Sequence, residues 1–215
     1  MIEGIIFDKD GIVFDTEPYY ARSNIQALAR HGVNLTEEEY YSFWTRDGGS
    51  LESYLAGKGR DHLNYHYLSF ERRRILNEML EERLPLIEGV AGVIKLLSQE
   101  FPLSLVTSSH KEDTFHMLQL AGLLSYFNPV ITAQDVKNKK PHPEGFLLAS
   151  EGMGIDPSNV VVIEDAEKGV IAAKEAGMKC VAIPTAYTKE NDFSRVDVVL
   201  DDVRKLTKRF IDGLK

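Results

Sequence analysis

The chain has 215 residues, of which 43% are hydrophobic and 27% charged, so it can bury one large core and a smaller second one. Its formal net charge of -8 disfavours nucleic acid and anionic membrane surfaces, and we expect neither as a partner. No run is long and apolar enough to span a bilayer, and the first residues form a strand-like segment containing Glu3 rather than a signal peptide. We therefore expect a cytoplasmic protein.

Short apolar runs alternate with helical patterns over most of the chain. The runs are continuously apolar, as expected for strands covered on both faces, and lie at residues 2–7, 103–107, 129–132, 160–164, 180–184 and 196–200. Helical patterns at 112–123, 143–154 and 167–178 separate the later runs, and the first of these places Phe115, Leu118 and Leu120 near one face. This alternation predicts an α/β fold, a Rossmann-like parallel sheet flanked by helices.

Residues 15–87 carry helical patterns and no strand-like run. One helix is predicted over 17–31, Thr36 and Glu39 have the spacing of a capping box, another helix starts near Ser50, and a long one covers 61–83. We therefore predict an α/β core domain of residues 1–14 and 88–215, interrupted after its first strand by an all-helical domain of residues 15–87.

Side chains that can act in catalysis or bind ligands lie at the C-terminal ends of the predicted strands. These are Asp8 and Asp10, Thr107 and Ser108, Lys140, and Glu164 and Asp165. Parallel strands bring these ends to one edge of a sheet, where ligands bind. In an extended chain Asp8 and Asp10 point the same way, and Gly11 allows a sharp turn after them.

Carboxylates placed so close together need a nearby cation. Four acids at two neighbouring strand ends make a hard oxygen site of the kind that Mg²⁺ prefers. With a lysine and hydroxyl groups opposite, such a site is suited to handling phosphate.

At this point the sequence resembles the haloacid dehalogenase superfamily of phosphatases and phosphomutases. "FDKDGIVFDTEP" (7–18) is similar to its first motif, and Thr107, "KKPHP" (139–143) and "IEDAEKGVIAAKEAG" (163–177) follow in the order of its other motifs. The pattern is most similar to the β-phosphoglucomutase-like and phosphoglycolate-phosphatase-like branch. The helical block corresponds to the cap domain of that family, a lid hinged near residues 15–17 and 84–89.

The resemblance implies a role for each motif residue. Asp8 would be the nucleophile that forms an aspartyl-phosphate, and Asp10 the general acid and base. Asp8, Asp10, Glu164 and Asp165 would hold Mg²⁺, with Asp10 contributing its main-chain carbonyl. Thr107, the backbone N–H of Ser108 and Lys140 would hold the phosphoryl oxygens. From the helical block, Thr16, Tyr20 and Arg46 are candidates for contact with substrate.

The predicted function is therefore a Mg²⁺-dependent phosphatase acting on a small phosphorylated metabolite, such as a sugar phosphate, as a monomer or weak dimer. A phosphomutase of the β-phosphoglucomutase type is the alternative, since it would use the same core. A more distant alternative is a phospho-accepting signalling domain, which would need neither the helical insertion nor the D-x-D-G turn.

Overall fold

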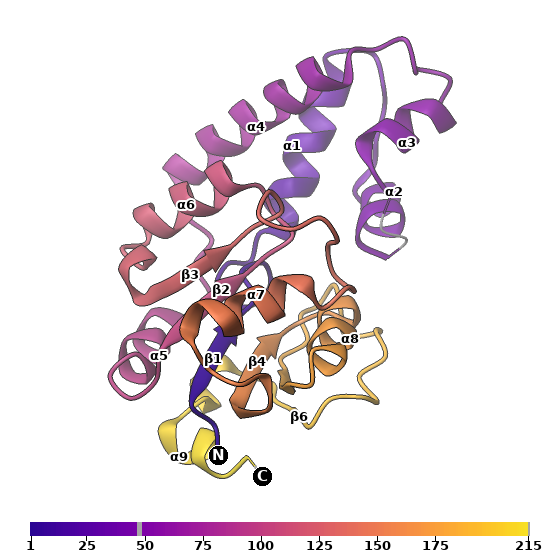
Figure 1. Ribbon diagram of the computed structural model, residues 1–215. Coiled ribbons are helices and arrows are strands. Elements are labelled where there is room, and N and C mark those ends of the chain that lie inside the picture. Colours follow the sequence, from indigo (N-terminus) through magenta and orange to yellow (C-terminus); the bar gives the residue numbers. More distant parts are fainter. Residues whose placement is uncertain (47–48, 215) are drawn as a thin grey trace. The chain divides into compact units, whose positions relative to one another are not determined.

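The computed structural model of the chain describes residues 1–46 and 49–214, which form two compact units. The core unit comprises Met1–Asp15 and Pro85–Lys215, and the helical unit comprises Thr16–Leu84 (Figure 1). The helices of the described residues lack the length and apolar character that a membrane crossing requires.

The described part of the core unit contains one six-stranded parallel sheet with the strand order β3-β2-β1-β4-β5-β6 (Figure 1). The strands are β1 (Gly4–Phe7), β2 (Leu103–Val106), β3 (Phe127–Ile131), β4 (Val160–Glu164), β5 (Lys179–Ala182) and β6 (Val198–Val199). The chain runs outward from β1 to β3 and then returns to β4 on the other side of β1. Strand order thus reverses between β1 and β4, which is where α/β sheets bind ligands.

Helices cover both faces of this sheet, which confirms the predicted α/β fold and explains the continuously apolar strands. They are α5 (Val90–Leu97), α6 (Lys111–Leu120), α7 (Glu144–Met153) and α8 (Glu167–Glu175), with the short α9 (Lys208–Asp212) near the C-terminus. Ile6, Val162 and Cys180 are paired neighbours on three strands, and they pack in one cluster with Phe146 of α7 and Val170 of α8. Right-handed crossovers place α5 and α6 on the opposite face.

The prediction for α6 was wrong in one respect, because Leu120 does not share a face with Leu118. The structure buries Thr114, Met117 and Leu118, whereas Leu120 is 47% exposed. Residues three and four apart lie on the same face of a helix, and Leu120 is only two residues beyond Leu118.

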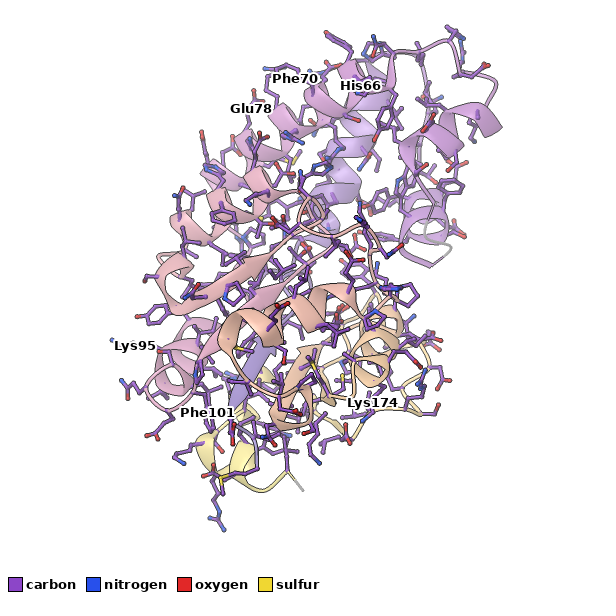
Figure 2. All side chains as sticks on the ribbon, viewed as in Figure 1. His66, Phe70, Glu78, Lys95, Phe101 and Lys174 are labelled. Carbon is purple, nitrogen blue, oxygen red and sulfur yellow. The ribbon has the colours of Figure 1, made fainter. Side chains whose placement is uncertain are left out.

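The helical unit forms its own core around α1 (Glu17–Ala29), α2 (Glu37–Tyr40), the π-helical turn η1 (Tyr41–Arg46), α3 (Leu51–Gly57) and α4 (Tyr65–Glu82). Its aromatic side chains pack on one another: the Tyr40 and Trp44 rings stack with centroids 5.1 Å apart, and Trp44 and Tyr54 lie 4.8 Å apart. Figure 2 labels His66, Phe70 and Glu78 along α4, where the Phe70 side chain is exposed.

The predicted helix starts in this unit are largely confirmed. Thr36 and Glu39 form the capping box, in which each backbone N–H donates to the other residue's side chain at 3.1 Å. Ser50 caps α3. The long helix begins at Tyr65 rather than 61. The Asn64 side chain accepts a hydrogen bond from the Tyr67 N–H and so caps the N-terminus of the helix at this point.

We expect Leu118→Ala to lower the free energy of unfolding by about 2–5 kcal/mol, since it removes a fully buried side chain. Leu120→Ala is the matched control on the same helix, and its half-exposed side chain should cost less than about 1 kcal/mol. Urea unfolding of both variants measures the difference. Equal losses would contradict the assignment of the buried face of α6.

Candidate active site

The C-terminal end of β1 leads directly into a tight turn. The Asp8 N–H donates to the Ile163 carbonyl at 2.9 Å, so pairing with β4 continues through Asp8. Gly11 then has a φ of 84°, a left-handed conformation that favours glycine. A Cβ atom at Gly11 would overlap the Asp165 carboxylate, so glycine also allows the turn to approach this residue closely.

Three buried carboxylates meet where β1 and β4 end. Asp8, Glu164 and Asp165 each offer an oxygen atom, and these atoms lie within 4.8 Å of one another. Their side chains are almost fully buried, with residue exposures of 7%, 2% and 8%. Because β1 and β4 are adjacent in the sheet, strand pairing itself brings Asp8 next to Glu164 and Asp165.

Lys140 places an ammonium group among these carboxylates. Its Nζ lies 2.5 Å from Asp8 Oδ1 and 2.6 Å from Glu164 Oε1, and it donates to the Val106 carbonyl at 3.0 Å. Burial by itself would lower the pKa of Lys140, but Asp8 and Glu164 outweigh burial and raise it. The charged form of Lys140 is therefore favoured, and it offsets part of the carboxylate charge.

One cation does not compensate for three carboxylates. Burial raises the pKa of Asp8 to about 7, with Lys140 opposing the shift and Glu164 and Asp10 adding to it. Burial also raises the pKa of Asp165, and the charges of Glu164 and Asp8 raise it further. Full ionisation of this group thus calls for more positive charge than Lys140 provides.

The donor set fits a divalent metal ion. Asp8, Glu164 and Asp165 present hard oxygen atoms in a buried position, as Mg²⁺ and similar ions require. Glu164 is held firmly, because its Oε2 accepts hydrogen bonds from the N–H groups of Asp165 at 3.0 Å and Ala166 at 3.2 Å. The Thr188 hydroxyl donates to Asp165 Oδ2 at 3.3 Å.

The Asp10 side chain has different partners. Its Oδ2 accepts hydrogen bonds from the hydroxyls of Thr107 at 3.1 Å and Ser109 at 2.6 Å, and its Oδ1 lies 3.1 Å from Lys9 Nζ. The Asp10 side chain is 27% exposed, so it is more accessible than the three clustered acids. The two aspartates of the first motif therefore occupy two distinct environments.

The remaining predicted residues fall into two groups. Thr107, Ser108 and Lys140 line one pocket of the core unit. Thr16 and Tyr20 belong to the helical unit, where Thr16 precedes α1 and the Tyr20 ring lies 5.9 Å from the Arg72 guanidinium. Arg46 ends η1, and its side chain lies outside the described part of the chain.

Comparison with known proteins identifies the family of the chain. Residues 5–183 match the family model of the haloacid dehalogenase-like hydrolases. The chain belongs to this hydrolase family. Fructose-1-phosphate phosphatase YqaB of Escherichia coli is 31% identical to this chain, and the similarity covers 84% of this chain and 95% of the relative. The phosphorylated carbohydrates phosphatase of Thermotoga maritima is 32% identical, with 83% of each chain covered.

A solved structure has a similar fold. CbbY from Rhodobacter sphaeroides in complex with phosphate has a TM-score of 0.86 and 26% identity, covering 99% of this chain and all of that chain. The hydrolase is thus an enzyme of the phosphatase branch of its family.

Several residues that shape the site had no predicted role in it. Lys9 and Ser109 hold Asp10, Thr188 donates to Asp165, and Gly169 of α8 lies against the Glu164 carboxylate. The position of Lys9 between the two aspartates was the sequence feature that could have indicated its role. Ser109 has the same side-chain chemistry as Thr107 two residues earlier, but Thr188 lies in a loop after β5 without a recognisable motif.

We expect Gly169→Ala to destabilise the enzyme, because the added Cβ would overlap the Glu164 carboxylate and force it from its hydrogen bonds. Gly92→Ala is the matched control: both glycines are the third residue of a helix, and a Cβ at Gly92 meets nothing within 4 Å. Gly92→Ala should raise the free energy of unfolding by up to about 1 kcal/mol. Thermal unfolding of the two variants should shift in opposite directions, and a stabilised Gly169→Ala enzyme would contradict the close contact with Glu164.

Proposed function

We propose that the enzyme is a Mg²⁺-dependent phosphatase that hydrolyses a small phosphorylated metabolite, such as a sugar phosphate, through an aspartyl-phosphate at Asp8. The observation that carries this proposal is the buried group of Asp8, Glu164 and Asp165 with Lys140 Nζ 2.5 Å from Asp8. Asp8 stands at the carboxyl end of β1, where strand order reverses and a substrate can reach the sheet.

The first half of the reaction transfers the phosphoryl group to the protein. A carboxylate oxygen of Asp8 forms a bond to phosphorus while the bond from phosphorus to the substrate oxygen breaks, and Asp10 gives a proton to that leaving oxygen. Lys140 holds the carboxylates of Asp8 and Glu164 in place through its contacts with both. Thr107, Ser108 and Lys140 line one pocket, which supports the proposal that the Thr107 hydroxyl, the Ser108 N–H and the Lys140 ammonium bind phosphoryl oxygens.

The second half hydrolyses the aspartyl-phosphate. Asp10, now a carboxylate, takes a proton from water as the water oxygen attacks phosphorus, and phosphate leaves with Asp8 restored. A bound Mg²⁺ would supply the positive charge that the three carboxylates and the phosphoryl group together require. Asp8, Glu164 and Asp165 would be its protein side-chain ligands, and the main-chain carbonyl of Asp10 is a further candidate.

The names of two similar phosphatases support one class of substrate. They are named for fructose 1-phosphate and for phosphorylated carbohydrates, and the similar CbbY structure contains phosphate. A phosphorylated sugar or sugar-like metabolite is therefore the substrate class that we propose. Thr16, Tyr20 and Arg46 of the helical unit are the proposed specificity contacts, with this unit acting as a lid that excludes water.

Phosphate release should be measured with fructose 1-phosphate, glucose 6-phosphate, phosphoglycolate, nucleoside monophosphates and p-nitrophenyl phosphate. We expect hydrolysis of at least one sugar phosphate, and Asp8→Asn should reduce every rate by at least about a hundredfold, because the amide is a poor nucleophile. Undiminished activity of that variant would overturn the role of Asp8. Conversion of β-glucose 1-phosphate to the 6-phosphate without phosphate release would identify a mutase instead.

Mg²⁺ affinity should rise with pH. The pKa of Asp8 is about 7 in the folded enzyme and near 3.8 when exposed, so the folded state binds this proton more tightly. The contribution of Asp8 to the stability of the metal-free enzyme is therefore complete below about pH 4 and is lost as the pH rises to about 7. Mg²⁺ binds the carboxylate form, so its affinity should fall up to about tenfold per pH unit below 7 for each proton displaced.

Thermal unfolding with increasing Mg²⁺ at about pH 6 and about pH 8 measures this effect. The stabilisation should appear at lower Mg²⁺ concentration at the higher pH, and EDTA should remove both the stabilisation and the activity. Asp165→Asn is the control that deletes one ligand charge and should weaken the response at both pH values. Equal Mg²⁺ affinity of the intact enzyme at the two pH values would contradict a link to carboxylate protonation.

A further inference from the structure

A fully buried lysine separates the two aspartates of the first motif. Lys9 has no solvent-exposed surface, and its Nζ lies 3.1 Å from Asp10 Oδ1 and 3.8 Å from the Met117 sulfur atom of α6. Lys9 lies at a bend shortly after β1, where its carbonyl accepts hydrogen bonds from the N–H groups of Val13 at 2.9 Å and Phe14 at 3.0 Å. The Lys9 ammonium group contacts Asp10 from a position without access to solvent.

An ammonium group in this position is costly for the fold. Burial of a charged group is strongly unfavourable unless the charge is paired, and an apolar side chain would fill the space beside Met117 without this cost. The Asp10 carboxylate, 3.1 Å from Lys9 Nζ, is a charged partner of Lys9. This pairing indicates that Lys9 acts on the position of Asp10 rather than on the stability of the core.

Donors from the loops that follow β1 and β2 contact Asp10. Lys9 contacts Oδ1, and the hydroxyls of Thr107 and Ser109 donate to Oδ2. Thr107 is also the residue proposed to bind the phosphoryl group, so its hydroxyl has a second acceptor once substrate is present. Lys9 is fully buried and has no proposed contact with substrate, so its contact with Asp10 would persist when substrate binds.

We propose that Lys9 is a positioning residue that holds the Asp10 carboxyl group where it can deliver a proton to the leaving oxygen. The inference rests on the proposed phosphatase mechanism. The step concerned begins in the substrate complex with Asp10 protonated: an Asp8 oxygen bonds to phosphorus, the bond to the leaving oxygen breaks, and the Asp10 proton moves to that oxygen. Asp10 ends the step as a carboxylate beside the Lys9 ammonium, ready to accept a proton from water.

The leaving group distinguishes this role from a purely structural one. A sugar alkoxide is a poor leaving group and needs the proton from Asp10, whereas p-nitrophenolate leaves without protonation. The ratio kcat/KM reports substrate binding and the first phosphoryl transfer, and it excludes the later hydrolysis of the aspartyl-phosphate. Displacing Asp10 should therefore affect kcat/KM for a sugar phosphate far more than for p-nitrophenyl phosphate.

Lys9→Met keeps an unbranched side chain and removes the ammonium group. We expect kcat/KM to fall at least about tenfold for fructose 1-phosphate, or for whichever sugar phosphate is hydrolysed fastest, and less than about threefold for p-nitrophenyl phosphate. In an Asp10→Asn background, Lys9→Met should cause no further loss with the sugar phosphate, since Lys9 acts through Asp10. Lys95→Met, at an exposed lysine of α5 labelled in Figure 2, should change neither value.

Equal losses with the two substrates, or a further loss in the Asp10→Asn background, would show that Lys9 is only structural and would overturn the inference. No loss with either substrate would also overturn it. If thermal unfolding shows that Lys9→Met does not fold, Lys9→Gln, which retains a polar donor, is tested by the same ratio. Failure of the proposed function is separate: the unmodified enzyme would then hydrolyse neither substrate.

Discussion

Repulsion among buried carboxylates is the constraint on which the architecture of the core unit depends. Asp8, Glu164 and Asp165 are held within 4.8 Å of one another in a place that water hardly reaches. The Lys140 ammonium between Asp8 and Glu164 offsets part of this charge, and the raised pKa values of Asp8 and Asp165 reflect the remainder. A site with this imbalance is stabilised when a cation binds, and a bound cation in turn favours an anionic phosphoryl group.

The fold keeps this unfavourable group together through the backbone rather than through the acids themselves. Pairing of β1 with β4 fixes Asp8 opposite the end of β4, and two backbone N–H groups hold the Glu164 carboxylate. Gly11 and Gly169 allow the chain to lie against Asp165 and Glu164 where any side chain would intrude. The energy that holds the acids in place therefore comes from the sheet and its apolar faces, which are buried whatever the charge state of the site.

Much of this arrangement could be predicted from the sequence, because it follows from strand periodicity and chain order. Continuous apolar runs indicated a sheet covered on both faces, and the carboxyl ends of parallel strands must share an edge. Lys140 could be separated from Lys137 and Lys139 only by the proline that follows it, and the structure places Lys140 on Asp8. The exposure of Leu120 follows from helix periodicity, which the prediction for this helix misapplied, whereas contacts that depend on loop packing, such as that of Thr188 with Asp165, could not be predicted.

The two aspartates show why sequence spacing alone is insufficient at the site. Spacing predicts that Asp8 and Asp10 point the same way, yet each has its own lysine: Lys140 from a distant loop contacts Asp8, and the adjacent Lys9 contacts Asp10. The proposed mechanism needs one aspartate as nucleophile and the other as proton donor, two roles that require different surroundings. A separate cation for each aspartate keeps two similar carboxylates, one residue apart, from sharing a single environment, and so allows one motif to supply both functions.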